Sequence, residues 1–182
     1  MSLSTEQKDS FASQLHDAAR SGHQVPMLTA ETAFSMVEAY DIQEVLIQKR
    51  IDEGAPLVGM KMGLTSLAKM EQMGVDSPIY GHLTSDMLLD DGGTLDLSVY
   101  GHPRVEPEVA FIMAEDIKGP TTSAQVALAV KGVCAALEVI DSRYENFKFT
   151  LNDVVADNAS STRFVLGTEL HPVDSVPLGN LG

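Results

Sequence analysis

Cysteine is scarce in the 182-residue chain, and no long hydrophobic run is present. The single cysteine, Cys134, cannot form an internal disulfide, which favours a reducing compartment, and its apolar neighbours predict a small core residue. The chain contains no run of about 18 apolar residues, so no transmembrane helix is predicted. The first residues, MSLSTEQKDSFASQ, lack the basic and apolar regions of a signal peptide. We therefore expect a soluble, cytoplasmic protein.

Basic residues are also few, since 12 lysines and arginines stand against 26 aspartates and glutamates, for a formal net charge of −14. Such a charge repels a nucleic-acid backbone and an anionic membrane surface, so neither is an expected partner. An acidic small molecule can still bind if a cation or a local basic cluster cancels the repulsion within the site.

Several common catalytic and binding motifs are missing. The chain has no GxSxG nucleophile elbow, no Walker-type phosphate loop, no GxGxxG dinucleotide signature and no CxxC pair. It also has no low-complexity tract or internal repeat. The candidate motifs that remain are acidic.

The length is suited to one hydrophobic core and is short for two domains. We expect a single domain over residues 1–182, with a helical part at 1–56 and a sheet-forming part at 57–182. An amphipathic helix is predicted at 4–20, where Ser4 and Gln7 resemble a capping box. A second helix is predicted at 29–53. Its inward-facing residues are predicted to be Phe34, Val37, Ile42, Val45 and Leu46.

The second part alternates strands, turns and short helices. A strand around 57–63 precedes a capping Thr65–Ser66 pair that can open a helix at 67–73. Residues 74–83 and 143–160 are predicted to be irregular. Further predictions are a short strand at 86–89, strands at 104–114, 134–142 and 163–170, a helix at 123–132 and a final loop at 171–182. This order predicts an α+β protein with a mixed sheet.

Glu106 and Glu108 lie two residues apart in the strand RVEPEVAF, and the period of two places both carboxylates on one face. Such a pair is most often a solvated strand face. Glu138 lies in the apolar run CAALEVIDS, where a buried carboxylate needs a partner. That partner could be Arg143 or Lys131. Alternatively, Glu138 joins the other two glutamates, and three carboxylates fit Mg²⁺ or Mn²⁺ better than zinc.

Lys61 lies in the strand GMKMG, whose small residues allow another group to approach its ammonium closely. It could hold a substrate carboxylate, although a lysine that extends to the surface is the more common arrangement. His82 and His102 follow glycines in predicted turns and are expected to face solvent. Neither histidine is a site candidate.

Four blocks of sequence, in order, resemble the 2-keto-4-pentenoate hydratase and 4-oxalocrotonate decarboxylase family of the fumarylacetoacetate hydrolase-like superfamily. They are GMKMGLTSLAKMEQMGVDSPIYGHL, VEPEVAF, LEVIDSRYENFKF and VVADNASSTRF. The blocks fall within residues 57–166, and the predicted N-terminal helices also have the family's character.

The resemblance implies a mixed β-roll of the fumarylacetoacetate hydrolase C-terminal-domain type, which follows the N-terminal helices. It also implies a divalent cation, Mg²⁺ or Mn²⁺, held by Glu106, Glu108 and Glu138. The family's strand lysine corresponds to Lys61, which is implied to contact a bound 2-oxo acid. The block around it implies that Leu64, Thr65 and Ser66 bind substrate, and Ile79 is expected to do the same.

The two branches of the family differ at Pro78-Ile79-Tyr80-Gly81, where hydratases usually have an aspartate in place of Ile79. Isoleucine cannot transfer the proton that hydration of a dienol requires. The residues of the last two blocks also resemble those of the decarboxylases. We therefore expect the decarboxylase branch, in which a 2-oxo-3-hexenedioate loses CO₂ in the meta-cleavage degradation of aromatic compounds. The alternatives are the hydratase and a non-catalytic scaffold subunit.

Family members usually extend beyond the point that corresponds to residue 182. The resemblance therefore implies that the β-roll is incomplete at its C-terminus. We also expect a homo-oligomer, and a complex with the hydratase of the same pathway is a further possibility.

Overall fold

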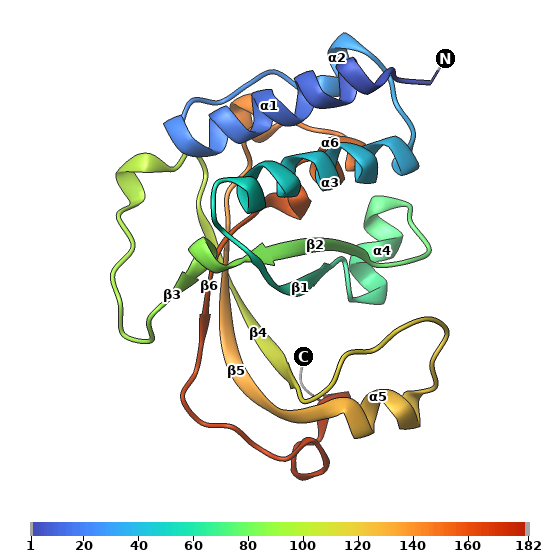
Figure 1. The fold of residues 1–182 in the computed structure, drawn as a ribbon, viewed down its shortest axis with the longest axis vertical. Coiled ribbons are helices and arrows are strands. Elements are labelled where there is room, and N and C mark those ends of the chain that lie inside the picture. The colour runs from blue at the N-terminus through green and yellow to red at the C-terminus, as the bar shows by residue number, and fades with distance from the viewer. Residues whose placement is uncertain (1, 181–182) are drawn as a thin grey trace.

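The helices within residues 5–52 and 151–156 gather at one end of the molecule, and the strands extend away from them, as Figure 1 shows. The structure is a computed structural model that describes the backbone of residues 2–180 and the side chains up to residue 179. Residues 181 and 182, the end of the predicted final loop, lie outside the described residues. The three longest elements of the helical end are α1 (Thr5–Ser21), α3 (Met36–Asp52) and α6 (Leu151–Ala156).

Helix α1 confirms the first helix that the sequence predicts. The Ser4 hydroxyl accepts a hydrogen bond from the Gln7 N–H at 3.2 Å, and the Gln7 side chain accepts one from the Ser4 N–H at 2.9 Å. The helix ends at Gly22, whose φ of 72° suits a residue without a side chain. Within residues 2–180 no helix has both the length and the apolar character needed to cross a membrane.

The prediction of one long helix over 29–53 is wrong. A short helix, α2 (Leu28–Glu31), ends at Thr32, and α3 begins only after Ser35. The break is stabilised by a second capping box, in which Ser35 and Glu38 exchange hydrogen bonds between side chain and backbone. Because α3 starts there, Val37 lies on its outer face and is 71% exposed, whereas Phe34 is buried.

The larger sheet has four strands in the order β3-β6-β5-β4. Their bounds are β3 (Leu88–Leu89), β4 (Arg104–Met113), β5 (Val130–Ile140) and β6 (Ser161–Leu166). Strand β3 runs parallel to β6, and the other neighbours are antiparallel, so the predicted mixed sheet is confirmed. Helix α5 (Ser123–Ala129) leads directly into β5.

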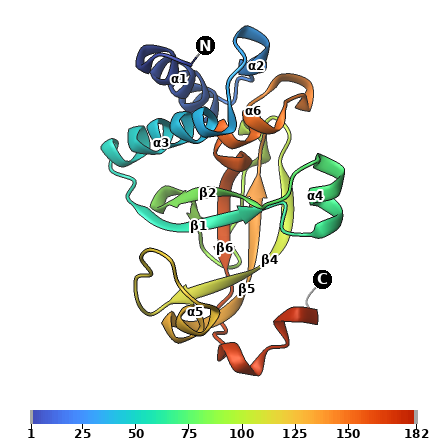
Figure 2. The same cartoon turned by 90° about the vertical axis from the view of Figure 1, so that its right-hand side faces the viewer.

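A separate antiparallel pair, β1 (Leu57–Gly63) and β2 (Ile79–Thr84), lies across the larger sheet in both views of the fold (Figures 1 and 2). Helix α4 (Leu67–Met73) connects the two strands, and Ser66 caps it as expected. The prediction of a loop at 74–83 is wrong for β2. Its inward-facing positions include Gly81, which has no side chain to reveal the alternation of a strand.

The remaining regular elements are single turns. They are the 3-10 helices η1 (Ser85–Met87), η2 (Leu97–Val99), η3 (Glu145–Phe147), η4 (Asn158–Ser160), η5 (Val173–Ser175) and η6 (Leu178–Asn180). In η4 all three residues have positive φ, so this turn is left-handed.

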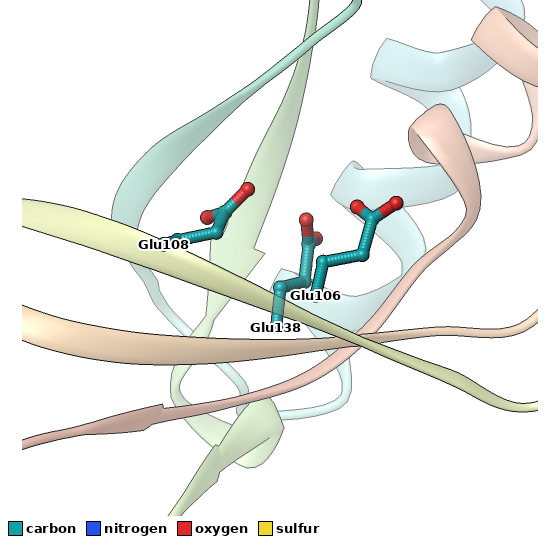
Figure 3. A group of neighbouring side chains, drawn as sticks. All are labelled: Glu106, Glu108 and Glu138. Atoms are coloured by element: carbon teal, nitrogen blue, oxygen red, sulfur yellow. The ribbon is translucent and has the colours of Figure 1, made fainter. Parts of the chain in front are cut away.

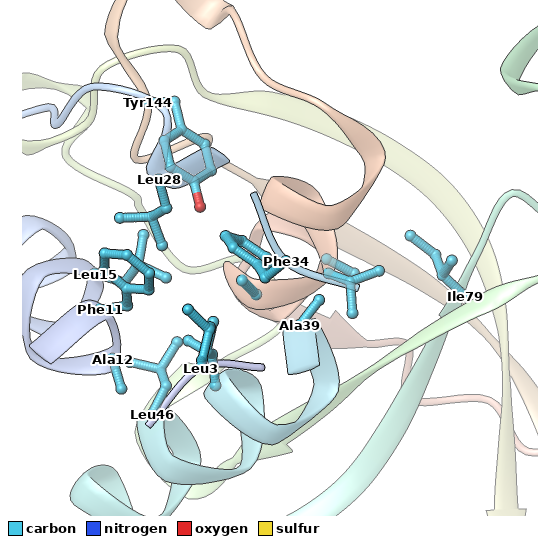
Figure 4. Packing of buried hydrophobic residues seen from close by; sticks show 14 residues of the cluster. Leu3, Phe11, Ala12, Leu15, Leu28, Phe34, Ala39, Leu46, Ile79 and Tyr144 are labelled. Atoms are coloured by element: carbon cyan, nitrogen blue, oxygen red, sulfur yellow. The ribbon is translucent and has the colours of Figure 1, made fainter. Parts of the chain in front are cut away.

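The principal core lies between α1, α3 and α6 and reaches Ile79 of β2 (Figure 4). Tyr144 is fully buried in it, and its hydroxyl donates to the Asp153 carbonyl at 3.0 Å. The expectation that 143–160 is irregular is therefore wrong for α6. The buried carboxylate of Asp153 is satisfied by the backbone N–H groups and the hydroxyls of Thr29 and Thr150, which donate hydrogen bonds to it. Cys134 is buried, as predicted, and the single-domain organisation stays a prediction.

We predict that Ser35→Ala destabilises the protein by about 1 kcal/mol, because the first-turn N–H groups of α3 lose their cap. For a chain of this size that corresponds to a melting temperature lowered by roughly 2–4 °C. Thermal unfolding monitored by circular dichroism measures the change. Ser10→Ala, on an exposed position inside α1, is the control and should not lower the melting temperature. Equal melting temperatures for Ser35→Ala and wild type would contradict the capping role.

Candidate functional site

The register of β4 and β5 brings the three predicted glutamates together. Glu106 pairs directly with Glu138 across the two strands, and Glu108 follows on the same face of β4, opposite Ala136. Figure 3 shows the three side chains on the same side of the sheet. One carboxylate oxygen from each lies within 4.8 Å of those of the others. Carboxylates directly opposite each other repel, so the cluster requires a compensating positive charge or protons.

The three carboxylates differ in burial. Glu138 is 2% exposed, Glu108 is half-buried and Glu106 is exposed. Burial raises the pKa of Glu138, and the Lys61 ammonium partly opposes the shift. Burial also raises the pKa of Glu108, and the neighbouring Glu138 adds to the effect. The cluster is therefore a poor place for three bare negative charges.

Lys61 supplies the first compensating charge. Its ammonium lies 2.9 Å from one Glu138 oxygen, and it donates a hydrogen bond to the Ala159 carbonyl at 3.3 Å. The side chain is buried, so the alternative of a surface-extended lysine is wrong. The other partners considered for Glu138 are also excluded: Arg143 pairs with Asp157 at 2.5 Å, and Lys131 is exposed.

The compensation is incomplete. When all three glutamates are ionised, one ammonium leaves two negative charges. Both oxygens of Glu138 are buried, and within the described chain neither has a hydrogen bond of normal geometry, despite the contact with Lys61. A divalent cation would neutralise the remaining charge and occupy these oxygens. Three carboxylates with room for water form the donor set of a hard ion such as Mg²⁺ or Mn²⁺.

Lys61 is held beside the left-handed turn η4. The φ values of Asn158, Ala159 and Ser160 are 51°, 50° and 59°. For residues with a side chain, this conformation costs about 1 kcal/mol or more each, so the surrounding contacts must enforce it. The turn directs the Ala159 carbonyl towards the Lys61 ammonium. Backbone strain is thus concentrated next to the buried charge.

Ile79 lies close to Lys61. It pairs with Gly63 across the β1–β2 hairpin, and a Cβ atom added at Gly63 would come within 3.1 Å of the Ile79 side chain and 3.9 Å of the Lys61 nitrogen. Ile79 is buried and apolar, and it belongs to the core. The position at which hydratases usually have an aspartate therefore offers no proton-transfer group here.

The other residues with a predicted substrate role follow β1. Leu64 is half-buried, with a φ of 56°, and Thr65 is exposed. The Ser66 hydroxyl is engaged in capping α4, where it accepts a hydrogen bond from the Lys69 N–H at 3.2 Å. No hydrogen bond between described residues joins these three side chains to the carboxylates. Their role in binding stays a prediction.

The two histidines expected to face solvent are partly buried. The His82 ring lies 3.0 Å from the Gln43 side chain through Nδ1, and burial lowers the pKa of His82. The backbone N–H of His102 donates a hydrogen bond to the Asp141 carboxylate at 2.6 Å. Both histidines are therefore tied into the fold.

Sequence reasoning missed residues of the VVADNASSTRF block as neighbours of the site. Asn158 and Ala159 form the turn beside Lys61. The buried Ser161 hydroxyl lies next to Glu138, where it opposes part of the rise that burial causes in the pKa of that carboxyl. The sequence did contain a signal for this turn, because asparagine is one of the residues other than glycine that most readily adopt the left-handed conformation. An isolated block of small polar residues nevertheless gives no indication of its partner strand.

Similar proteins were found in sequence and in structure. A 4-oxalocrotonate decarboxylase from Pseudomonas sp is 50% identical over 172 residues, which are 94% of this chain and 66% of that protein. A 2-keto-4-pentenoate hydratase from Paraburkholderia xenovorans (strain LB400) is 37% identical over 168 residues, 91% of this chain and 62% of that protein. No protein-family model matches the chain.

A solved structure has the same fold. It is the 4-oxalocrotonate decarboxylase from Pseudomonas putida G7, complexed with magnesium and adipate, and it superposes with a TM-score of 0.93 at 40% sequence identity. The match covers 97% of this chain and 68% of that one. The chain thus spans about two thirds of the length of these relatives. The likeness confirms the α+β fold expected from the sequence.

These similarities assign the chain to a class of proteins, the α+β proteins of the decarboxylase and hydratase type. The chain belongs to the 2-keto-4-pentenoate hydratase and 4-oxalocrotonate decarboxylase family. Among the curated relatives, three decarboxylases are 42–50% identical to the chain and the hydratases are 37–40% identical.

We predict that the affinity for Mg²⁺ rises with pH. The raised pKa values of Glu108 and Glu138 mean that both carboxyls keep protons above their ordinary value of 4.5, and a cation must displace these protons. Binding is therefore weak near pH 4.5, and it strengthens until both groups are ionised. Titration calorimetry at several pH values measures the affinity and the protons released.

The variant Glu138→Gln should bind Mg²⁺ far more weakly than wild type, whereas Glu115→Gln, on an exposed residue just after β4, should bind normally. An affinity that stays constant as the pH rises above 4.5 would contradict the role of the buried carboxyls.

Proposed function

We propose that the protein decarboxylates 4-oxalocrotonate (2-oxo-3-hexenedioate) in a divalent-metal-dependent reaction, as a carbon-carbon lyase of aromatic meta-cleavage degradation. The observation that carries the proposal is the buried Glu138, whose oxygens lie between Lys61 and two further carboxylates. The relatives with this activity in their names match nearly the whole chain. The adipate in the solved relative is a six-carbon dicarboxylate, like the proposed substrate.

Glu106, Glu108 and Glu138 would hold the cation, Mg²⁺ or Mn²⁺. The bound ion supplies Lewis acidity towards the substrate's C1 carboxylate and 2-oxo oxygen. Magnesium and calcium accompany the solved relatives, and the net charge of the cluster fits a divalent ion. The remaining steps follow from the chain's own residues.

Lys61 would stabilise the negative charge that develops during the reaction. When the bond to the distal carboxylate breaks, CO₂ leaves and the electron pair moves through the conjugated double bond to the 2-oxo oxygen. The product is a dienolate, and a proton from solvent then completes 2-hydroxypenta-2,4-dienoate. A buried ammonium stabilises such an oxygen more strongly than it would in water, because little solvent screens it. Because Glu138 already holds the Lys61 ammonium in place, the ammonium does not have to move before the reaction.

Ile79 favours decarboxylation over hydration. Hydration requires a group that transfers a proton to or from the reacting carbons, and an apolar residue beside Lys61 cannot do this. Departure of CO₂ requires no such group at that position. Leu64, Thr65 and Ser66 are proposed to line the substrate site through the loop that follows β1.

The protein is also proposed to have a particular oligomeric state and cellular location. We propose a homo-oligomer, with a complex with the pathway's hydratase as the wider assembly, because apolar side chains on β4 are exposed. Val105 is 60% exposed, and Phe111 is 49% exposed. A metabolic reaction of this type and the single, buried Cys134 fit the cytoplasm.

We predict that the purified protein releases CO₂ from 2-oxo-3-hexenedioate and that chelation of divalent ions abolishes the release. Glu106→Gln should lower the rate by roughly a hundredfold or more, since losing ~3 kcal/mol of charge stabilisation corresponds to about two powers of ten. Its circular dichroism spectrum should match the wild type. Coupled CO₂ detection measures the rate, and Glu115→Gln is the matched control with normal activity.

Two results would overturn the proposal. One is full activity of Glu106→Gln in the presence of chelator. The other is hydration of 2-hydroxypenta-2,4-dienoate by the wild type without any decarboxylation, which would assign the protein to the hydratase branch.

We predict that Ile79→Asp lowers kcat/KM for decarboxylation by at least about tenfold, because a buried carboxylate would pair with Lys61 and repel the dianionic substrate. Ile79→Asn has a similar size and no charge, so the ratio of the two variants isolates the electrostatic effect. Ile79→Leu, which conserves volume, should stay near the wild type. Steady-state kinetics measure all three. Equal losses for Asp and Asn would show that the charge beside Lys61 has no influence.

A further inference from the structure

Asn158 connects the left-handed turn η4 to strand β2 through both ends of its side-chain amide. Its Oδ1 accepts a hydrogen bond from the His82 N–H at 2.8 Å, and its Nδ2 donates one to the His82 carbonyl at 2.9 Å. The side chain is 2% exposed, so water does not compete for these bonds. Only a carboxamide can both donate and accept in this way.

The turn packs tightly against the residues that surround Lys61. A Cβ atom added at Gly81 would lie 2.8 Å from the Asn158 carbonyl and 3.1 Å from the Lys61 Cδ. Gly81 is also the residue that pairs with Lys61 across the hairpin. The backbone of β2 is thus enclosed between the lysine side chain and the turn, and a shift of the turn would move both.

The far side of β2 is fixed to the helices by Gln43. Its amide donates to the Val155 carbonyl at 2.8 Å and to the Tyr80 carbonyl at 3.1 Å, and its oxygen lies 3.0 Å from the His82 ring. Residues on both sides of Gly81 are therefore immobilised. The position of η4 relative to β2 then depends on Asn158.

This arrangement determines the position of the Ala159 carbonyl. It faces the Lys61 ammonium at 3.3 Å, while one Glu138 oxygen faces the same ammonium at 2.9 Å. The two acceptors come from different elements, the turn η4 and the strand β5, and fix the ammonium from two directions. Without the clamp, the strained turn can relax, and the carbonyl is free to leave the ammonium.

We infer that Asn158 is a positioning residue for Lys61: its amide clamp on His82 holds the left-handed turn that places the Ala159 carbonyl on the lysine ammonium. The inference rests on the proposed function for its kinetic consequence, because Lys61 is the charge that meets the developing dienolate. The placement of the ammonium itself does not depend on the reaction.

The test uses Asn158→Gly, which removes both hydrogen bonds and still tolerates a positive φ, so the backbone is not strained further. Asn152→Ala is the matched control, because Asn152 lies in α6 and its amide donates to the Phe34 carbonyl at 2.6 Å, in the helical part of the fold. Each variant is made in the wild type and in a Lys61→Met background.

Kinetics give the first result. Asn158→Gly should lower kcat/KM roughly ten- to a hundredfold in the wild type, as misplacement of a catalytic group by about 1 Å does, and less than about twofold in Lys61→Met. Asn152→Ala should have the same small effect in both backgrounds. Equal factors for Asn158→Gly in the two backgrounds would overturn the inference, because the residue would then act independently of Lys61.

Lysine labelling gives a result that needs no turnover. With acetic anhydride and mass spectrometry, Lys61 should label slowly in the wild type and in Asn152→Ala, and several-fold faster in Asn158→Gly, with Lys8 and Lys49 unchanged. An unchanged Lys61 rate in Asn158→Gly would overturn the inference whatever the kinetics. If the wild type releases no CO₂, the proposed function fails, and the labelling alone decides the role of Asn158.

Discussion

The contact between the Lys61 ammonium and the Glu138 carboxylate is the interaction on which the site depends. Both groups are buried, and removing either would leave the other charge unpaired, at a cost of several kcal/mol in general. The pair does not neutralise the negative charge of the cluster, because the carboxylates of Glu106 and Glu108 lie close to the Glu138 oxygens. An ion pair that only stabilised the fold would not need two additional acids. The arrangement is understandable if the second positive charge is a bound cation.

The fold brings this pair together from strands that are distant in the sequence. Glu138 lies in the middle of the larger sheet on β5, and the cross-strand register fixes Glu106 beside it. Lys61 lies on β1, in a hairpin that crosses the sheet (Figure 2). The helices support the hairpin from the other side through Gln43, and η4 closes the gap between hairpin and sheet. A small change in the angle of the hairpin would separate the ammonium from the carboxylate, which explains the density of hydrogen bonds around β2.

The features that could be predicted from the sequence are those with a local or periodic cause. The E-x-E spacing in a strong strand gave the common face of Glu106 and Glu108, and the Ser4–Gln7 capping box gave the start of α1. The features that could not be predicted are set by contacts between distant segments. Strand β2 was missed because Gly81 hides its alternation, and the partner of Glu138 was left open because no local pattern connects residue 61 with residue 138. The buried Asp153 and Asn158 are polar, so hydrophobic periodicity did not indicate α6 and η4. Predicting which residues bind the metal required the resemblance as well as the spacing.

The site proposed for a divalent ion consists of three carboxylates and one lysine. A crystal grown with Mn²⁺ and measured near the manganese absorption edge tests it most directly. We expect one strong anomalous peak bonded to oxygens of Glu106, Glu108 and Glu138, with the Lys61 ammonium still beside Glu138. An anomalous peak elsewhere would contradict the proposed site. The absence of a peak at saturating Mn²⁺, with the three glutamates separated, would also contradict it.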